Sequence, residues 1–592
     1  MATYKAPLRD MRFVLNELLD TERLRRLPGC DEVTPDVVDS VLDEAAKVCE
    51  EVLFPLNRSG DEEGCHLVNG EVQTPKGFRE AYRTFAESGW TSLAADPDYG
   101  GQGLPKTLTV LMEEMFCSSN LSFGTYTGLS RGAYFALRTH GPDDIKRRFL
   151  PNLVSGTWAG TMCLTEPQCG TDLGLVRTKA VSQADGTYRI TGTKIFITAG
   201  DHDLTENILH LVLARLPDAP AGIKGISLFL VPKLLVREDG TLGARNGVGA
   251  TAIEHKMGLK ASATCVLDFE DAVGYLIGEP NKGMRAMFTM MNDERVSVGV
   301  QGLGLAEVSY QNAVAYARER LQGRSVAGAK HPDQPADPLI VHPDIRRMLL
   351  TMRAYIEGTR ALAAWVSLAI DEAARHPDAD TRRSGDEFVA LMTPIVKAFL
   401  TDIGFESTNL GMQVLGGHGY IREHGMEQYV RDARIGQIYE GTNGVQALDL
   451  VGRKLPAGYL ARFLEPVSAF IAAHRADAGL AEFVTPLDEA FGRLQEATAV
   501  IGRAGFTDPE EAVSGATEYL RLIGLVALAY LWARMAKAAV PKAGAGDDAR
   551  FYRAKVDTAR FFMQRVLPQT ASLLAAINAG GRSITGFDEA SF

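Results

Sequence analysis

Residues Gln413–Gln446 read QVLGGHGYIREHGMEQYVRDARIGQIYEGTNGVQ, a stretch with a glycine cluster near its start and one carboxylate, Glu440, between Tyr439 and Gly441. Glycine lets a backbone approach a ligand closely. An acid flanked in this way can end a helix beside a bound molecule. A Gly-rich turn with a solvated glutamate fits the same residues equally well, so the choice depends on the rest of the chain.

Length and composition set the first bounds. The chain has 592 residues, too many for one hydrophobic core, and its 46% hydrophobic and 23% charged residues are ordinary for a globular protein. A net charge of -12 argues against a general nucleic-acid surface, which needs clustered Lys and Arg. The longest apolar run, Leu522–Ala533, is shorter than the roughly 20 residues that span a bilayer. We therefore predict no transmembrane segment.

Cysteine and histidine usage indicates the compartment and the metal content. The seven cysteines include no C-x-x-C pair and none lies in the second half of the chain, which predicts free thiols in a reducing cytoplasm. The N-terminus lacks the apolar core of a signal peptide. The eleven histidines form no ligand-spaced pair, so we predict no metal site.

Changes of periodicity along the chain divide it into five segments. We expect an N-terminal arm at 1–30 with a helix over Met11–Arg26, and a helical domain at 31–158 that begins at Thr34-Pro35-Asp36. A β domain follows at 159–277, a second helical domain at 278–457, and an additional helical domain at 458–592. The predicted fold class is thus α+β.

We predict the β domain from short runs of β-branched or aromatic residues that are separated by turn-forming residues. No helix of useful length separates these runs, and no G-x-G-x-x-G follows a strand, so an antiparallel sheet is favoured over a Rossmann fold. The expected strands are Tyr188–Ala199, Ile208–Ala214, Ile226–Val231 and Thr264–Phe269.

The second helical domain begins with a long apolar pattern over Met284–Arg320. Gly299, Gly302 and Gly304 interrupt this pattern, and each costs a helix about 1 kcal/mol relative to Ala. Close helix–helix packing is the simpler explanation, with ligand approach as a second use of the same surface. Beyond residue 457 the pattern is helical and shows no Gly-rich or acid–base constellation, which indicates a structural role.

Two short segments of the expected β domain contain candidate ligand-binding residues, the first of them at its junction with the N-terminal helical domain. Met162–Gly174 reads MCLTEPQCGTDLG, whose hydroxyls and glycines suit a polar ring edge or a phosphate but also fill ordinary loops. Phe196 and Thr198 are two residues apart on a predicted strand and so share one face. The ring can cover a flat ligand while the hydroxyl binds its edge.

Taken together, the motifs of this chain resemble those of the acyl-CoA dehydrogenase family. The matching runs occur in family order and cover roughly residues 31–455: CLTEPQCGTD at Cys163–Asp172, FIT at Phe196–Thr198, KMGLKAS at Lys256–Ser262, RERLQGR at Arg318–Arg324, QVLGGHGY at Gln413–Tyr420 and IYEGTN at Ile438–Asn443. The length beyond this core resembles the long bacterial branch, which includes fatty acyl-CoA and 3-methylthiopropanoyl-CoA dehydrogenases.

The resemblance implies an FAD enzyme that converts an acyl-CoA thioester to the trans-2-enoyl-CoA, as in fatty acid β-oxidation. It implies Glu440 as the catalytic base, Arg295 as a supporting residue near the active site, and no metal. It also implies a homo-oligomer, a dimer or tetramer, because Arg320, Gln322, Gln413 and Gly417 match contacts to a neighbouring subunit's FAD. The remaining cofactor contacts implied are Leu164, Thr165, Gly170, Thr171, Phe196, Thr198 and Thr442.

Several alternatives stay open at this level. Some family members carry the base at the position of Glu294, directly before Arg295, and this chain has acids at both places. The electron acceptor implied is an electron-transferring flavoprotein, but an acyl-CoA oxidase would use oxygen. A DNA-associated flavoprotein of the same fold would need a basic surface, and a nitroalkane-oxidising relative would carry Asp in place of Glu440.

Overall fold

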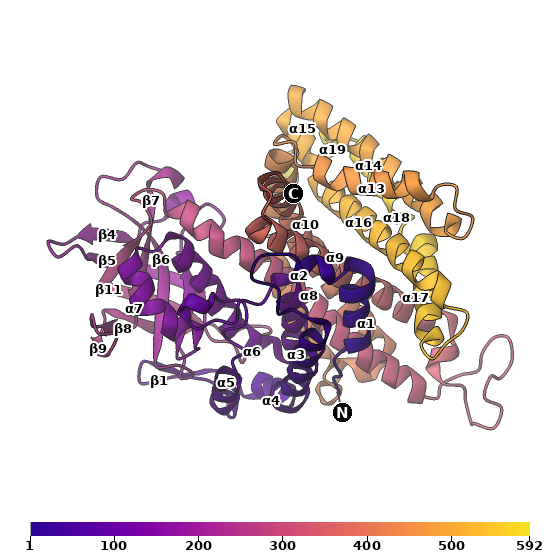
Figure 1. Cartoon of the computed structure of the whole chain (residues 1–592), viewed down its shortest axis with the longest axis horizontal. Coiled ribbons are helices and arrows are strands. Elements are labelled where there is room, and N and C mark those ends of the chain that lie inside the picture. Colours follow the sequence, from indigo (N-terminus) through magenta and orange to yellow (C-terminus); the bar gives the residue numbers. More distant parts are fainter. Residues whose placement is uncertain (1) are drawn as a thin grey trace. The chain divides into compact units, whose positions relative to one another are not determined.

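The computed structural model describes residues 2–592 and divides into two compact units (Figure 1). Unit 1 comprises residues 1–43, 106–118 and 298–592, and unit 2 comprises residues 44–105 and 119–297. Residues 458–592, which the sequence sets apart by pattern, therefore cluster with the helices of unit 1.

Unit 2 is organised around a seven-stranded sheet of order β10-β11-β5-β4-β6-β3, in which β7 pairs with both β11 and β6. All four expected strands form. The sequence did not single out the other three, β3, β4 and β10. The bounds are β3 (Trp158–Cys163), β4 (Lys179–Ser182), β5 (Tyr188–Thr198), β6 (Asn207–Arg215), β7 (Ile226–Pro232), β10 (Val248–Ile253) and β11 (Thr264–Ile277).

The sheet is mixed, which corrects the expected purely antiparallel arrangement. β3 pairs with β6 in parallel along its whole length, from Trp158 opposite Asn207 to Cys163 opposite Val212. β4 also meets β6 in parallel, at Lys179 opposite Arg215. The antiparallel β4–β5 pair lies between β3 and β6 in sequence, so the chain enters β6 in the direction in which it left β3. The expected absence of a Rossmann topology holds.

Outside this sheet, unit 2 contains the helices α4 (Pro55–Glu63), α5 (Phe78–Glu87) and α7 (Asp143–Val154). It also contains the two-stranded sheet of β8 (Leu234–Val236) with β9 (Leu242–Arg245) and the hairpin of β1 (His66–Val68) with β2 (Glu71–Gln73). The hairpin was not predicted, because three-residue strands give too little alternation to detect. Helix α6 (Lys106–His140) is divided between the units, with residues 106–118 in unit 1, and it breaks at Asn120, whose φ is -158°. At this break the side-chain amide of Asn120 donates a hydrogen bond of 3.2 Å to the carbonyl of Leu53.

The N-terminal arm of unit 1 contains three short helices in place of the one long helix that we predicted. The predicted continuous helix over Met11–Arg26 is wrong: α1 (Leu8–Arg12), a π-helix (Phe13–Leu19) and α2 (Glu22–Arg25) replace it. The chain turns at Asp20, which has a φ of 66° that a helix does not allow.

Long helices form the body of unit 1: the part of α8 (Gly283–Glu319) from Val298 onward, α9 (Pro343–Arg375) and α10 (Ala379–Val414). A Cβ added to Gly302 would lie 2.6 Å from the carbonyl oxygen of Leu400, and one on Gly404 would lie 2.5 Å from that of Gly302. Gly299 and Gly302 therefore allow close packing of α8 on α10, as the simpler explanation predicted. Gly304 instead faces α6, where an added Cβ would lie 2.8 Å from the Cβ of Cys117. Two shorter helices follow, α11 (Met426–Arg434) and α12 (Asn443–Asp449).

The C-terminal helices of unit 1 are α13 (Ala461–His474), α14 (Ala481–Thr507), α15 (Pro509–Ser514), α16 (Ala516–Ala539), α17 (Ala549–Phe561), α18 (Gln569–Asn578) and α19 (Arg582–Thr585). Helix α16, which contains the apolar run, contacts α9, α10, α14, α17 and α18. Helix α10 and Ala516–Lys542 are long and apolar enough to cross a membrane, but 78% of each apolar window is buried. Both are therefore core helices of unit 1.

A buried cluster of charges joins distant segments of unit 1. Arg360 on α9 donates to both oxygens of Glu114 at 2.9–3.0 Å and to Glu307 at 2.6 Å. Lys555 on α17 is fully buried and binds Glu357 at 2.7 Å, and both cations also reach Asp10 in α1. The cluster thus ties the N-terminal arm and the C-terminal helices to α9.

Candidate functional site

The residues that the sequence singled out fall in both units, and each group is described within its own unit. Unit 2 contains Leu164, Thr165, Gly170, Thr171, Phe196, Thr198, Glu294 and Arg295. Unit 1 contains Arg320, Gln322, Gln413, Gly417, Glu440 and Thr442.

Six residues of the unit 2 group lie in or just after the ends of β3 and β5: Leu164, Thr165, Gly170, Thr171, Phe196 and Thr198. The carbonyl of Thr165, just after β3, accepts a hydrogen bond of 2.9 Å from the backbone N–H of Ile195. Phe196 follows with a φ of 59°, in the left-handed region, and its ring is 59% exposed. A left-handed, exposed aromatic on a strand is costly for the isolated protein and points to a ligand. Gly170 and Thr171 lie exposed in the same loop after β3.

Two residues without a predicted role, Glu166 and Lys194, hold this loop in place. They form an ion pair of 2.8 Å with side chains 3% and 0% exposed, and the Lys194 ammonium also donates to the carbonyl of Leu164 at 3.0 Å. Glu166 further accepts bonds from Thr178 and from the backbone N–H of Arg177. Burial alone raises the pKa of Glu166, but Lys194 and these hydrogen bonds outweigh it and lower the pKa to about 2.

Cys169 lies in the same loop and helps to stabilise its conformation. Its side chain is buried, and its thiol donates to the carbonyl of Asp172 at 3.1 Å. Burial raises the pKa of this thiol, which keeps it protonated and unreactive at neutral pH. The contact therefore gives Cys169 a structural role in this loop.

Glu294 and Arg295 lie on the part of α8 that belongs to unit 2. Glu294 is 5% exposed, and a Cβ added to Gly132 of α6 would lie 3.0 Å from its Oε1. The absence of a side chain at Gly132 thus makes room for the carboxylate. Arg295 is partly buried, donates to Asn292 at 3.3 Å, and places its guanidinium 5.9 Å from the Phe288 ring centre.

In unit 1, Arg320 and Gln322 lie exposed in a tight loop that follows α8. The backbone N–H of Gln322 donates to the carbonyl of Asp337 at 3.0 Å, and that of Leu339 donates to Arg320 at 2.9 Å. The fully buried Asp337 carboxylate accepts backbone bonds from Ser325, Lys330 and His331 at 2.7–2.9 Å. One buried aspartate thus organises this loop.

The role of Asp337 predicts a protease-sensitive variant. In Asp337→Ala the three backbone donors lose their acceptor, so we expect the segment 324–337 to open and trypsin to cut at Arg324 or Lys330 many times faster than in the wild type. Asp333→Ala, an exposed position in the same loop, is the control and should digest at the wild-type rate. Equal digestion of Asp337→Ala and wild type would contradict this role.

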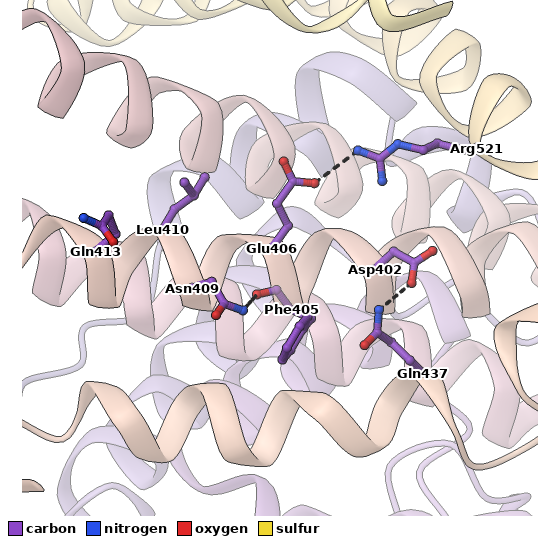
Figure 2. A pocket seen from close by; sticks show the side chains of 8 residues that line it. All are labelled: Asp402, Phe405, Glu406, Asn409, Leu410, Gln413, Gln437 and Arg521. Atoms are coloured by element: carbon purple, nitrogen blue, oxygen red, sulfur yellow. Dashed lines mark hydrogen bonds and ion pairs between the residues drawn. The ribbon is translucent and has the colours of Figure 1, made fainter. Parts of the chain in front are cut away.

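Gln413 lines a groove of about 590 Å³ in unit 1 (Figure 2). The groove runs along α10 past Phe405 and ends near Arg521 of α16, which donates to Glu406 at 3.1 Å. Gln437 donates to Asp402 at 2.7 Å at the same end. Gly417 lies exposed in the 3₁₀ turn Gly416–Tyr420 that follows α10.

Glu440 stands on a strained turn before α12. Its φ is 56° and that of Gly441 is 81°, so two successive residues adopt the left-handed conformation. The side chain of Gln446 donates to the carbonyl of Glu440 at 3.1 Å, and Tyr439 donates to Gln301 of α8. Thr442 caps α12 by accepting from the backbone N–H of Val445 at 3.3 Å. Non-glycine residues in this conformation cluster at functional sites, which sets Glu440 apart from a solvated turn residue.

The structure adds two findings on thiols and metals. All seven cysteines are free, and six of them are buried. Within residues 2–592, no group of three or more His, Cys, Asp or Glu side chains is placed to hold a metal ion.

Comparisons with known proteins agree along the whole chain. Family models match in order: the acyl-CoA dehydrogenase N-terminal domain at 38–157, middle domain at 161–272 and C-terminal domain at 281–455, and the acetyl-CoA dehydrogenase C-terminal like domain at 463–588.

Curated relatives cover nearly the full length. The chain is 43% identical to a 3-methylmercaptopropionyl-CoA dehydrogenase of Ruegeria pomeroyi, over 98% of this chain and 99% of that protein. It is 34% identical to a broad-specificity linear acyl-CoA dehydrogenase of Mycobacterium tuberculosis, over 100% of both chains. A structure of an acyl-CoA dehydrogenase complexed with FAD from Bacillus anthracis shares the fold, with a TM-score of 0.74, 20% identity and coverage of 97% and 91%.

Proposed function

The chain belongs to the acyl-CoA dehydrogenase family of FAD-dependent oxidoreductases, and from this premise we propose that Glu440 is the base that removes the α-proton of an acyl-CoA thioester. The observation that supports this role best is the left-handed turn at Glu440 and Gly441, held at a fixed place between Tyr439 and helix α12. A base must be held rigidly against a weakly acidic C–H to act on it.

The residues of both groups fit FAD. The exposed Phe196 ring supplies a flat apolar face, and the hydroxyls of Thr165 and Thr198 can bind the polar edge of the flavin. We also assign Leu164, Gly170 and Thr171 of unit 2, and separately Thr442 of unit 1, to FAD binding. The exposed Arg320 offers the planar, permanently charged fork that suits the pyrophosphate of a neighbouring subunit's FAD. Bound FAD supplies the hydride acceptor for the β-carbon.

The chain's own groups account for the proton chemistry. Glu440 accepts the proton from the α-carbon while its backbone N–H donates to the thioester oxygen, where negative charge develops. Arg295 supports the active-site geometry. Glu294 remains on α8 as a buried carboxylate near Gly132, and we assign it no part in proton abstraction.

We propose that the substrate is an acyl-CoA thioester with a short chain. The 43% identity to the Ruegeria protein, against 34% to the Mycobacterium protein, favours 3-methylmercaptopropionyl-CoA over a linear fatty acyl-CoA. An electron-transferring flavoprotein would be the partner that accepts the electrons from the bound cofactor.

We further propose a cytoplasmic homo-oligomer. Gln322, Gln413 and Gly417 are exposed in unit 1, where a neighbouring subunit's FAD would meet them, and the groove in Figure 2 has Gln413 in its wall. The free thiols suit a reducing compartment.

The proposal predicts that acyl-CoA thioesters bleach the flavin of the purified protein without oxygen. We expect the fastest bleaching with 3-methylmercaptopropionyl-CoA and slower bleaching as linear chains lengthen. Absorbance after anaerobic mixing measures this half-reaction directly. No bleaching with any thioester would overturn the dehydrogenase function.

The same preparation separates the rival functions. Peroxide release at the rate of turnover would identify an acyl-CoA oxidase. Bleaching by a nitroalkane but not by thioesters would identify a nitroalkane-oxidising flavoprotein, against which the Glu at 440 argues. Salt-sensitive retention of DNA without thioester activity would identify a DNA-associated flavoprotein, against which the net charge of -12 argues.

A further inference from the structure

A fully buried lysine lies directly behind the turn that holds Glu440. Lys397, on α10, has no exposed surface, and its ammonium donates to the carbonyl of Gly441 at 2.6 Å and to the side-chain oxygen of Asn443 at 2.8 Å. Burying an ammonium is expensive, so the structure retains it only where it makes strong hydrogen bonds. Both of these bonds end within three residues of Glu440.

Asn443 connects this lysine to the rest of α10. Its amide nitrogen donates to Asp402 at 2.7 Å and to the carbonyl of Ala398 at 3.2 Å. The hydroxyl of Thr401 lies 3.3 Å from the amide oxygen and 3.0 Å from the amide nitrogen. The oxygen faces Lys397 and the nitrogen faces Asp402, so the orientation of the amide is fixed by its partners.

We propose that Lys397 and Asn443, with Thr401 and Asp402, form a clamp that positions Glu440 for proton abstraction. The proposal rests on the role of Glu440 as the base. It adds residues that have no part in the proposed function above. The left-handed turn at Glu440 and Gly441 is unfavourable by itself and persists only where the surroundings impose it. The clamp forms hydrogen bonds to the C-terminal side of the turn, at the carbonyl of Gly441 and the side chain of Asn443.

The clamp acts through geometry and not through contact with the substrate. Lys397 and Asn443 are therefore positioning residues, and their loss should slow proton abstraction more than it weakens thioester binding. Misplacing a reacting group by about 1 Å can cost on the order of 100-fold in rate. A residue that only stabilised the fold would lower the melting temperature and leave kcat per folded, FAD-loaded enzyme unchanged.

The test replaces Lys397 by Met in the full-length FAD enzyme. We expect kcat per bound FAD to fall about 100-fold while KM changes far less. Asn443→Leu should give a similar loss. The double variant should lose about as much as either single variant, because both residues act on one turn. Thr401→Val, an isosteric change in the same clamp, provides a milder variant if Lys397→Met does not fold.

Lys555→Met is the matched control, since Lys555 is also fully buried in unit 1 but bonds to Glu357 and Asp10. It should melt earlier yet keep the wild-type kcat when assayed well below its melting temperature. A wild-type kcat in both Lys397→Met and Asn443→Leu would overturn the clamp. Glu440→Gln, measured alongside, distinguishes the clamp from the assignment of Glu440 as the base. If Glu440→Gln stays active, the assignment of the base fails. If Glu440→Gln is inactive while the clamp variants have a wild-type kcat, only the clamp fails.

Discussion

Glu440→Gln should lose turnover by about 10⁴-fold while still binding FAD, the upper end of what removal of a general base costs. Gln is close to Glu in size and keeps the backbone turn, but its amide cannot accept the α-proton. The backbone N–H at 440 remains, so thioester binding should change little. Stopped-flow bleaching of the flavin by the preferred thioester measures the chemical step, and the ratio of flavin to protein absorbance reports the bound FAD.

Glu294→Gln is the control for this experiment, because Glu294 is the other acid that the family pattern admits as a base. It should retain the chemical step within an order of magnitude of the wild type, although the buried position can lower its stability. If Glu440→Gln keeps substantial activity and Glu294→Gln does not, the two assignments must be exchanged.

Lys194→Met should destabilise unit 2 and release FAD. The substitution leaves the Glu166 carboxylate buried without its cation, which typically costs about 3–5 kcal/mol. At about 2–4 °C per kcal/mol, the melting temperature of a unit of this size falls by on the order of 10 °C. The loop with Leu164 and Thr165 also loses a hydrogen bond from the ammonium, so FAD affinity should fall with it. Calorimetry and FAD titration measure the two effects.

Two further variants test this explanation. Lys179→Met changes an exposed lysine on the adjacent strand and should melt with the wild type. Lys194→Met with Glu166→Gln removes both charges and should recover much of the lost stability, because an uncharged pair has no unpaired ion to bury. If the double variant were no more stable than Lys194→Met, the ion pair would not be the cause.

The same pair predicts an acid-sensitive step. The folded-state pKa of Glu166, about 2, lies below its ordinary value of 4.5. The ionised pair therefore stabilises unit 2 fully above about pH 4.5, and this contribution is lost as the pH falls from about 4.5 toward 2. Urea unfolding at about pH 5 and about pH 3 should show a smaller loss of stability in the doubly neutral variant than in the wild type. An equal loss in both would show that other carboxylates govern the acid response.

Much of the fold follows from local patterns in the chain. Tyr188–Thr198 and Ile226–Pro232 are strands because their β-branched and aromatic residues favour a pleated surface, and the start of α3 (Pro35–Lys47) is set by its proline. The same local evidence failed in predictable ways. Strands of three residues, as in β1 and β2, have no detectable alternation, and the parallel β3–β6 pairing depends on partners far apart in sequence.

The sequence by itself determined the family, because six short motifs with fixed spacing occur in family order, and the same motifs supply Glu440, Arg320 and Phe196 as the residues we propose for the site. Only the tertiary structure showed what holds these residues: Lys194 behind the loop of unit 2, Asp337 inside the loop after α8, and Lys397 behind the turn of Glu440. Lys194 and Lys397 bind groups that are distant from them in sequence, and Asp337 binds backbone groups across its own loop. The role of each depends on burial and hydrogen-bond geometry, which arise only when the chain has folded.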